Sequence, residues 1–321
     1  MVIKKNISLK AYNTFGIDVK ASRFVSIASL YELKQLLNSE KDFFLISGGS
    51  NLLLTRDIER LVVHINIQGI SIDHEEENTV DLTVNAGENW HEFVLWCISE
   101  NYGGLENLSL IPGNVGTSPI QNIGAYGVEV KDCITKVEAL EIATNKLVSF
   151  SNEACNFGYR NSIFKNEVKG KYILTSVSFR LTTKNHQLTT SYGAIENELA
   201  VQKIKIPTLK NISDAIIGSF FKNPVISKKQ FLRLQKENPS IPNYPVSETE
   251  IKVPAGWLVE QSGFKGKRFG DAGVHEKQAL VLVNYGSATG IEIFQLAEKI
   301  QQTVFKKFEI ALEIEVNVVA S

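Results

Sequence analysis

The chain has 321 residues, of which 43% are hydrophobic and 21% are charged. Its 34 basic and 35 acidic residues leave a formal net charge of −1, which argues against nucleic-acid binding, because such proteins show a basic excess or stripe. The length allows two or three domains with their own cores. No apolar run reaches membrane-spanning length and no apolar signal segment opens the chain, so we expect a cytoplasmic protein without a membrane partner.

The N-terminal part combines helix and strand signals. Leucines at helical spacing predict a helix over 29–40, and apolar runs predict a buried strand over 43–49 and a further strand over 61–67. The next elements in chain order are a hairpin over 69–87, a helix over 90–103, a hairpin over 136–150 and a strand over 172–182. The three acidic residues 75–77 are expected at a solvated hairpin tip.

After a polar crossing at 184–218, helical patterns become more frequent. The expected elements are helices over 227–238, 254–263 and 291–308, a strand over 278–284 and a last strand over 311–319. Strands and helices do not alternate regularly, so the pattern predicts an α+β fold in at least two domains instead of a doubly wound sheet. Neither the G-x-G-x-x-G fingerprint nor a P-loop occurs, so a bound dinucleotide would follow the rules of another fold.

Cysteine and histidine usage predicts no metal site and no disulfide framework. Cys97, Cys133 and Cys155 are few and widely spaced, so we expect reduced thiols in or near a core. The five histidines are isolated, and no His, Cys, Asp or Glu cluster has metal-ligand spacing.

Two glycine-rich segments are candidates for anion binding. The first glycine loop covers residues 47–54, SGGSNLLL, and the second covers residues 111–127, IPGNVGTSPIQNIGAYG, which has no charged residue. Such loops can offer bare backbone N–H groups to a pyrophosphate, although a long surface loop explains either segment alone. Two of them between β segments suggest a ligand with more than one phosphate, such as FAD.

Three further positions carry polar chemistry, each with a simpler alternative. Arg160 can clamp a carboxylate or stabilise an enolate-like anion, or it can merely pack on Tyr159. Ser219 can donate a proton to a strongly basic carbanion, or it can cap a helix. Glu315 shares one strand face with Glu313, which matters only if that face is buried.

Seven motifs in order give the chain a resemblance to a known family. They are NTFG from 13, GGSNLLL from 48, the second glycine loop, FGYRNSIFK from 157, GSFFKNP from 218, AGWLVEQSGFKG from 255 and VHEKQALVLVN from 274. This succession resembles the UDP-N-acetylenolpyruvoylglucosamine reductase family, in the branch with a tyrosine-bearing segment, here TTSYGAI with Tyr192.

The resemblance implies an FAD-binding part of the vanillyl-alcohol-oxidase type, made of two α+β subdomains, and an α+β substrate domain. The FAD-binding part would cover residues 1–204 with a closing strand at 312–321, and the substrate domain would cover 205–311. It implies reduction of FAD by NADPH, followed by reduction of the enolpyruvyl group of a UDP-sugar. A monomer is expected.

The resemblance also implies functional residues. FAD contacts would come from Ser47, Gly48, Gly49, Ser50, Asn51, Leu52, Pro112, Gly113, Gly116, Ser118, Gln121, Asn122 and Gly124. Substrate contacts would come from Tyr159, Tyr192, Lys205, Asn223, Tyr244 and Lys265. Arg160 would stabilise the negative charge on the substrate, Ser219 would protonate its C2 atom and Glu315 would assist. The family often has Glu-Pro-Glu at the terminal motif, and Ile314 here replaces the proline, which leaves the aim of Glu315 less defined.

Two other functions remain as alternatives. One is another FAD oxidoreductase with the same cofactor fold, such as an oxidase of small alcohols, which has no use for a proton-donating serine. The other is a non-catalytic nucleotide-sugar sensor, against which the joint presence of Arg160, Ser219 and Glu315 argues.

Overall fold

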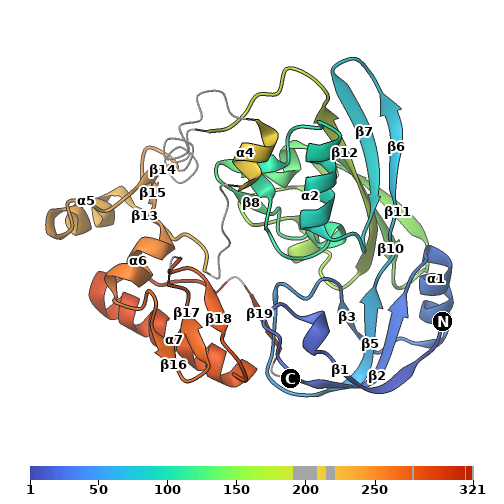
Figure 1. Cartoon of the computed structure of the whole chain (residues 1–321), viewed down its shortest axis with the longest axis horizontal. Coiled ribbons are helices and arrows are strands. Elements are labelled where there is room, and N and C mark those ends of the chain that lie inside the picture. The colour runs from blue at the N-terminus through green and yellow to red at the C-terminus, as the bar shows by residue number, and fades with distance from the viewer. Residues whose placement is uncertain (191–207, 215–220, 277, 315, 320–321) are drawn as a thin grey trace. The chain divides into compact units, whose positions relative to one another are not determined.

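The computed structural model describes residues 1–190, 208–214, 221–276, 278–314 and 316–319 (Figure 1). The chain forms two compact units. The first unit comprises Met1–Ile7, Ala21–Gly49 and Ile58–Ile217, and the second comprises Ser8–Lys20, Ser50–Asp57 and Gly218–Ser321. Helices and strands occur in both units, which confirms the predicted α+β class.

A four-stranded sheet in the order β1-β2-β5-β3 forms one part of the first unit. Its strands are β1 (Lys4–Ser8), β2 (Lys20–Ile27), β5 (Ile58–Ile65) and β3 (Phe43–Ile46). Both β2 and β3 run parallel to β5. Helix α1 (Leu30–Ser39) connects β2 to β3, is capped by the Ser29 side chain and buries Leu33, Leu36 and Leu37 against this sheet. The 3–4 residue spacing of these leucines places them on one helix face.

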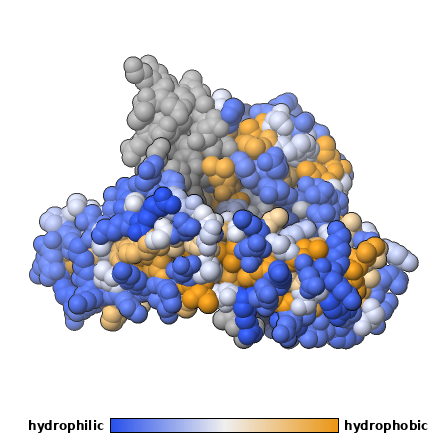
Figure 2. Space-filling model, turned by 60° about the horizontal axis from the view of Figure 1, so that its bottom comes forward, coloured by the Kyte–Doolittle hydropathy of each residue, from blue (hydrophilic) through white to orange (hydrophobic). Residues whose placement is uncertain are grey.

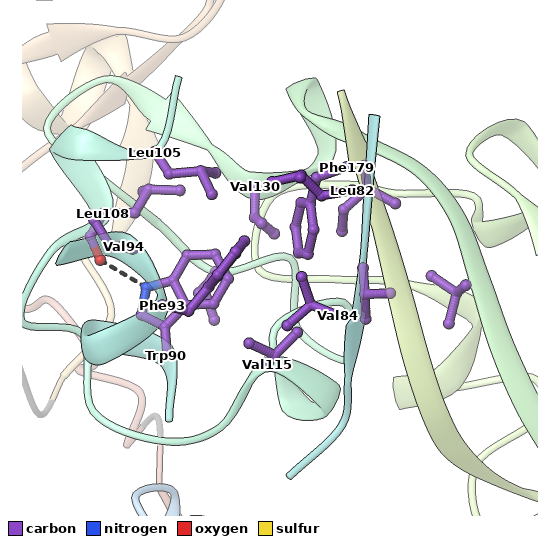
Figure 3. Close-up of a cluster of buried hydrophobic side chains, with 14 of the residues drawn as sticks. Leu82, Val84, Trp90, Phe93, Val94, Leu105, Leu108, Val115, Val130 and Phe179 are labelled. Atoms are coloured by element: carbon purple, nitrogen blue, oxygen red, sulfur yellow. Dashed lines mark hydrogen bonds between the residues drawn. The ribbon is translucent and has the colours of Figure 1, made fainter. Parts of the chain in front are cut away.

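A five-stranded antiparallel sheet in the order β11-β10-β12-β7-β6 forms the other part. Its strands are β11 (Leu147–Ser151), β10 (Ile134–Glu141), β12 (Tyr172–Thr182), β7 (Thr79–Asn85) and β6 (Ile70–Glu75). Helix α2 (Trp90–Ser99) lies against it and contributes Trp90 and Phe93 to a core with Phe179 of β12 (Figure 3). The Phe93 and Phe179 ring centroids are 5.3 Å apart. Alternate buried residues on β7 show why its sequence forms a half-buried strand.

Short elements complete the first unit. They are β8 (Gly124–Ala125), β9 (Val128–Glu129), α4 (Leu209–Asp214) and the 3₁₀ turns η2 (Glu106–Leu108), η3 (Val115–Thr117), η4 (Val130–Asp132), η5 (Glu153–Cys155) and η6 (Ile163–Lys165). Most of these turns lie in or beside the second glycine loop and the segment around Arg160.

The second unit contains three small sheets and three helices among its described residues. The sheets are β13 (Val225–Ser227), β15 (Glu250–Lys252) and β14 (Tyr244–Pro245); β16 (Arg268–Phe269), β17 (Ala272–Val274) and β18 (Leu282–Asn284); and the parallel pair β4 (Leu52–Leu54) and β19 (Asn317–Val319). The helices are α5 (Lys228–Glu237), α6 (Ala255–Gln261) and α7 (Gly290–Phe308), and the unit also holds the 3₁₀ turn η1 (Lys10–Tyr12).

Helix α7 shows how local sequence sets both ends of an element. Thr289 and Glu292 form a capping box, in which the Thr289 Oγ1 atom accepts from the Glu292 N–H group at 3.2 Å and the Glu292 Oε2 atom accepts from the Thr289 N–H group at 2.7 Å. The helix ends where Glu309 adopts a left-handed conformation with φ 55°. Its buried residues follow a helical period: Ile293, Leu296, Ala297, Ile300, Val304 and Phe308.

The sequence predicted many of these elements, with several errors of extent: the helix expected over 90–103 ends at Ser99, and the strand expected over 43–49 ends at Ile46. The predicted helices over 29–40, 90–103, 227–238, 254–263 and 291–308 correspond to α1, α2, α5, α6 and α7. The strand expected over 311–319 begins only at Asn317, because Ile314 forms an isolated bridge with Phe221 instead of continuing a ladder. The strand expected over 278–284 is confined to Leu282–Asn284.

Surface and core properties agree with several expectations. Residues 75–77 are exposed at the tip of the β6–β7 hairpin, as predicted. The three cysteines are free thiols; Cys97 and Cys155 are buried and Cys133 is partly buried. Hydrophilic side chains cover most of the face shown in Figure 2, with smaller apolar areas between them. Within the described residues, we find no helix long and apolar enough to cross a membrane.

Candidate functional site

The two glycine-rich loops lie against each other. A Cβ atom on Gly48 would lie 2.7 Å from the Gly113 Cα atom and 2.6 Å from the Asn114 Oδ1 atom. Real Cβ atoms do not approach other atoms so closely, so any larger residue at position 48 forces the backbone to shift. Segments far apart in the sequence therefore meet backbone to backbone.

Both loops offer hydrogen-bond donors. The backbone N–H groups of Ser47, Gly48, Gly49, Gly113 and Asn114 have no acceptor among the residues that the structure describes. The Ser47 hydroxyl is buried, and within the same described part it also has no hydrogen-bond partner. Buried polar atoms in proteins normally have partners, so this hydroxyl is suited to a ligand atom.

The loop conformations place these donors on glycine-dependent backbone. Gly49 has φ +60° and Gly113 has φ +121°, conformations that side-chain-bearing residues rarely adopt. Successive N–H groups in such turns form concave anion sites without any charged side chain. The donor set therefore fits the pyrophosphate of FAD.

Other predicted cofactor residues have roles within the protein. The Gly116 N–H group donates to the Ala86 carbonyl at 3.0 Å, and the buried Ser118 hydroxyl donates to the Val115 carbonyl at 2.8 Å. Pro112 is exposed and Gln121 is partly buried. Contacts of these residues with a cofactor remain predictions, as do contacts of Ser50, Asn51 and Leu52, which belong to the second unit.

Arg160 lies in a tight turn formed by residues 158–161. Gly158 and Asn161 exchange backbone hydrogen bonds of 3.0 and 3.1 Å, and Arg160 has φ +53°. The Arg160 guanidinium donates from its Nη2 atom to the Gly124 carbonyl, and its Cζ atom lies 5.7 Å from the Tyr159 ring centroid. The structure thus brings the predicted catalytic arginine to the second glycine loop.

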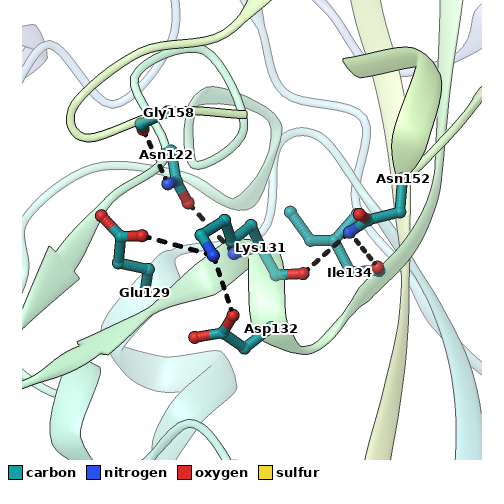
Figure 4. A network of polar contacts seen from close by, with 7 residues as sticks. All are labelled: Asn122, Glu129, Lys131, Asp132, Ile134, Asn152 and Gly158. Atoms are coloured by element: carbon teal, nitrogen blue, oxygen red, sulfur yellow. Dashed lines mark hydrogen bonds and ion pairs between the residues drawn. The ribbon is translucent and has the colours of Figure 1, made fainter. Parts of the chain in front are cut away.

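Two side chains fasten the turn at 158–161 to the second glycine loop. The Asn122 Nδ2 atom donates to the Gly158 carbonyl at 2.9 Å (Figure 4), and the Ser162 hydroxyl donates to the Ile120 carbonyl at 2.6 Å. Both Asn122 and Ser162 are almost fully buried. Sequence reasoning assigned no role to Ser162; its only signal was its position in the FGYRNSIFK motif.

Asn122 belongs to a polar network that includes Lys131, Asp132 and Glu129. Its Oδ1 atom accepts from the Lys131 N–H group at 3.1 Å (Figure 4). The Lys131 Nζ atom lies 3.2 Å from Asp132 Oδ1 and 3.6 Å from Glu129 Oε2. The hydrogen bond to Asp132 raises the pKa of Lys131, so its ammonium stays charged near neutral pH.

In the second unit, the described substrate candidates already have protein partners. The Asn223 Oδ1 atom accepts from the Ala255 N–H group at 2.9 Å, which satisfies a donor at the first turn of α6. The Lys265 Nζ atom is 2.8 Å from Glu260 Oε1. Tyr244 lies in β14 opposite Lys252. Their contacts with a substrate remain predictions.

Four predicted site residues lie outside the described part of the chain: Tyr192, Lys205, Ser219 and Glu315. The neighbouring Glu313 is exposed and forms an ion pair with Lys222. Across the described residues, no group of three or more His, Cys, Asp or Glu side chains is placed to hold a metal ion.

Comparison with known proteins relates the chain to a family. Residues 24–151 match the FAD binding domain, and residues 210–319 match the UDP-N-acetylenolpyruvoylglucosamine reductase C-terminal domain. The fold is also that of the crystal structure of UDP-N-acetylenolpyruvylglucosamine reductase from Thermus caldophilus, with a TM-score of 0.68 at 23% identity over 99% of this chain and 100% of that one.

Full-length relatives are considerably closer in sequence. The UDP-N-acetylenolpyruvoylglucosamine reductase of Flavobacterium johnsoniae is 54% identical over 99% of this chain and 100% of its own length. The protein of the same name from Amoebophilus asiaticus is 45% identical with the same coverage. By this similarity, the chain belongs to the UDP-N-acetylenolpyruvoylglucosamine reductase family.

Proposed function

We propose that this chain uses NADPH to reduce the enolpyruvyl group of UDP-N-acetylglucosamine enolpyruvate. The product is UDP-N-acetylmuramate, a precursor of peptidoglycan. The observation that carries the proposal is the full-length similarity to named reductases, together with an FAD-binding domain. Two contacts of the second glycine loop also support it: Gly113 meets the first glycine loop, whose N–H groups are neutral anion donors, and Gly124 accepts a hydrogen bond from the cationic Arg160 side chain.

The glycine loops would hold the cofactor. FAD, when bound, supplies the two-electron chemistry that links NADPH to the enolpyruvyl double bond. The N–H groups of Ser47, Gly48 and Gly113 and the Ser47 hydroxyl are suited to its pyrophosphate. Because these donors are part of a closely packed backbone, they need little reorganisation to bind an anion.

Arg160 would stabilise the charge that develops on the substrate. Addition of a hydride to C3 of the enol ether leaves negative charge on C2 and its carboxylate. A guanidinium oriented by the Gly124 carbonyl can stabilise this charge through charge-assisted hydrogen bonds. Removing a preorganised donor of this kind typically slows turnover by about 10²–10³-fold.

The remaining roles rest on the sequence motifs. Ser219 would protonate C2, and Glu315 would assist that transfer or balance the charge of the site. Tyr159, Tyr192, Lys205, Asn223, Tyr244 and Lys265 would contact the UDP-sugar. We further infer that residues 1–204 and 312–321 form the FAD-binding part, that residues 205–311 form the substrate domain, and that the enzyme is a cytoplasmic monomer without a nucleic-acid or membrane partner.

A visible spectrum and a turnover assay test the proposal. The purified protein should be yellow and should oxidise NADPH rapidly only when UDP-N-acetylglucosamine enolpyruvate is added. Ser219→Ala should keep the flavin spectrum and its reduction by NADPH, but lose reduction of the sugar. A yellow protein whose NADPH oxidation does not respond to this sugar would overturn the substrate assignment. A protein that cannot be loaded with FAD would overturn the cofactor site.

A further inference from the structure

Arg160 occupies a turn position where glycine is expected. In the turn at 158–161 it is the third residue, and its φ of +53° is the signature of a type II turn, which favours glycine or asparagine at that place. A side-chain-bearing residue in this conformation is strained and persists only where the surroundings hold it. Contacts with neighbouring residues must therefore stabilise Arg160 in this conformation.

Lys165 contacts the backbone of the strained residue. Its Nζ atom donates to the Arg160 carbonyl at 2.9 Å, and its side chain is partly buried. Fixing this carbonyl fixes the peptide plane that follows Arg160, and with it the direction in which the arginine side chain leaves the backbone. An ammonium group is a stronger donor to a carbonyl than a neutral group.

The segment that carries Lys165 is itself anchored. Lys165 ends the η6 turn, directly after Phe164, which is buried in the core of the first unit. The Phe164 ring packs edge-on against Phe150 with ring centroids 5.1 Å apart. Two residues earlier, Ser162 is bonded to the Ile120 carbonyl. The backbone that carries Lys165 is therefore held in place where its side chain contacts Arg160.

The other end of Arg160 is held by the second glycine loop. Its guanidinium donates to the Gly124 carbonyl, and its Nη1 atom would lie 3.0 Å from a Cβ atom at Gly124. Arg160 is therefore constrained at two points, at its carbonyl by Lys165 and at its guanidinium by Gly124. These two contacts define the direction of the side chain.

We propose that Lys165 is a positioning residue for Arg160: its ammonium holds Arg160 in the left-handed conformation that directs the guanidinium to Gly124. The inference rests on the proposed function, in which Arg160 stabilises charge on the enolpyruvyl group. Lys165 itself touches neither the substrate nor the cofactor in this role. Its loss should affect only the half of the catalytic cycle that uses Arg160.

The first test compares the two half-reactions in Lys165→Met and in Lys169→Met, a matched control at an exposed lysine four residues away. Lys165→Met should keep its FAD content and its rate of flavin reduction by NADPH. Its turnover number with the enolpyruvyl sugar should fall between about tenfold and a hundredfold, as expected when a catalytic group is misplaced. The KM for the sugar should change much less. Lys169→Met should match the wild type in both half-reactions.

A double-mutant cycle tests whether Lys165 acts through Arg160. Adding Lys165→Met to Arg160→Ala should cause no further loss of sugar reduction, because the group being positioned is already absent. Multiplicative losses in the cycle, or an unchanged turnover number in Lys165→Met, would overturn the inference. If Lys165→Met loses its flavin, Lys165→Gln, which stays polar but lacks the ammonium group, takes its place in the same cycle and is judged by the same criterion.

The proposed function is tested separately by the wild type. A wild-type protein that does not reduce the enolpyruvyl sugar contradicts the function and, with it, the catalytic purpose of the Lys165 contact. A wild type that is active, beside an unaffected Lys165→Met, contradicts only the inference about Lys165.

Discussion

Gly48 and Gly113 approach each other so closely that a Cβ atom on Gly48 would lie 2.7 Å from the Gly113 Cα atom. This contact joins two loops whose N–H groups are the neutral donors of the site. Position 48 therefore needs a residue without a side chain because of this contact. Its backbone conformation does not require glycine, since Gly48 does not have a positive φ.

We expect Gly48→Ala to lose most of its FAD. The added methyl group must push Gly113 or Asn114 away, which separates the two loops and destabilises the protein by about 1–3 kcal/mol. Flavin absorbance per protein and the free energy of unfolding in urea measure both effects. The control is Gly170→Ala, where φ is +74° but no neighbour lies within 4 Å. It should destabilise the protein through backbone strain and leave the flavin content unchanged, and equal flavin loss in both variants would contradict the prediction.

We expect Asn122→Ala to weaken both stability and turnover. The change removes one of the two hydrogen bonds that the Gly158 carbonyl accepts and the side-chain acceptor of the Lys131 N–H group, and each lost hydrogen bond costs about 0.5–1.5 kcal/mol. The turn at 158–161 loses one of its two side-chain fastenings, so sugar reduction should fall more than flavin reduction by NADPH.

Asn145→Ala is the matched control for Asn122. Asn145 also has a positive φ, of 57°, and its Nδ2 atom is 2.9 Å from both the Lys34 carbonyl and Asn38 Oδ1. Asn145 lies at the β10–β11 hairpin. Asn145→Ala should therefore lower stability without changing the ratio of sugar reduction to flavin reduction by NADPH. A selective loss of sugar reduction in Asn145→Ala would refute the role assigned to Asn122.

Trp90→Phe should lower the free energy of unfolding by about 1–3 kcal/mol. The Trp90 Nε1 atom donates to the Leu108 carbonyl at 2.7 Å, and both residues are fully buried (Figure 3). Phenylalanine keeps an aromatic ring but leaves that carbonyl unsatisfied, just before the second glycine loop. Urea unfolding measures the effect, and Trp96→Phe, at a partly buried ring 6.3 Å from Phe93, should have a smaller one.

His64 should make the protein less stable in mild acid. Burial lowers the pKa of His64 from 6.5, and its Nδ1 atom lies 3.1 Å from the Ser26 hydroxyl. As the pH falls below 6.5 toward the folded-state pKa, the unfolded chain binds more protons than the folded one, so the free energy of unfolding decreases. Well above pH 6.5 both states are neutral at this residue and its contribution does not change with pH.

The measurement for His64 is urea unfolding at a series of pH values. His64→Gln should show a flatter decline between neutral pH and mild acid than the wild type. Equal slopes in the wild type and His64→Gln would show that His64 does not cause the decline.

The sequence predicted the elements with the strongest local patterns, and it missed the eight-residue strand β2. Helix α7 was expected over 291–308 and covers Gly290–Phe308, because its period of apolar residues and its capping box are both local. Strand β1 was not expected, since its side chains are mostly exposed and leave no alternating pattern. The strand expected over 311–319 was too long, because Ile314 forms only an isolated bridge with Phe221 and regular pairing is confined to Asn317–Val319.

For the site, the sequence by itself determined which segments carry the chemistry: two glycine loops, a Tyr-Arg motif, and their resemblance to one reductase family. Only the tertiary structure decided that Gly48 meets Gly113, that Asn122 fastens the turn at 158–161, and that Arg160 is left-handed. The physical reason is that these features depend on contacts between distant segments. A positive φ at an arginine has no local signal, since it is held by the Lys165 ammonium and the Gly124 carbonyl.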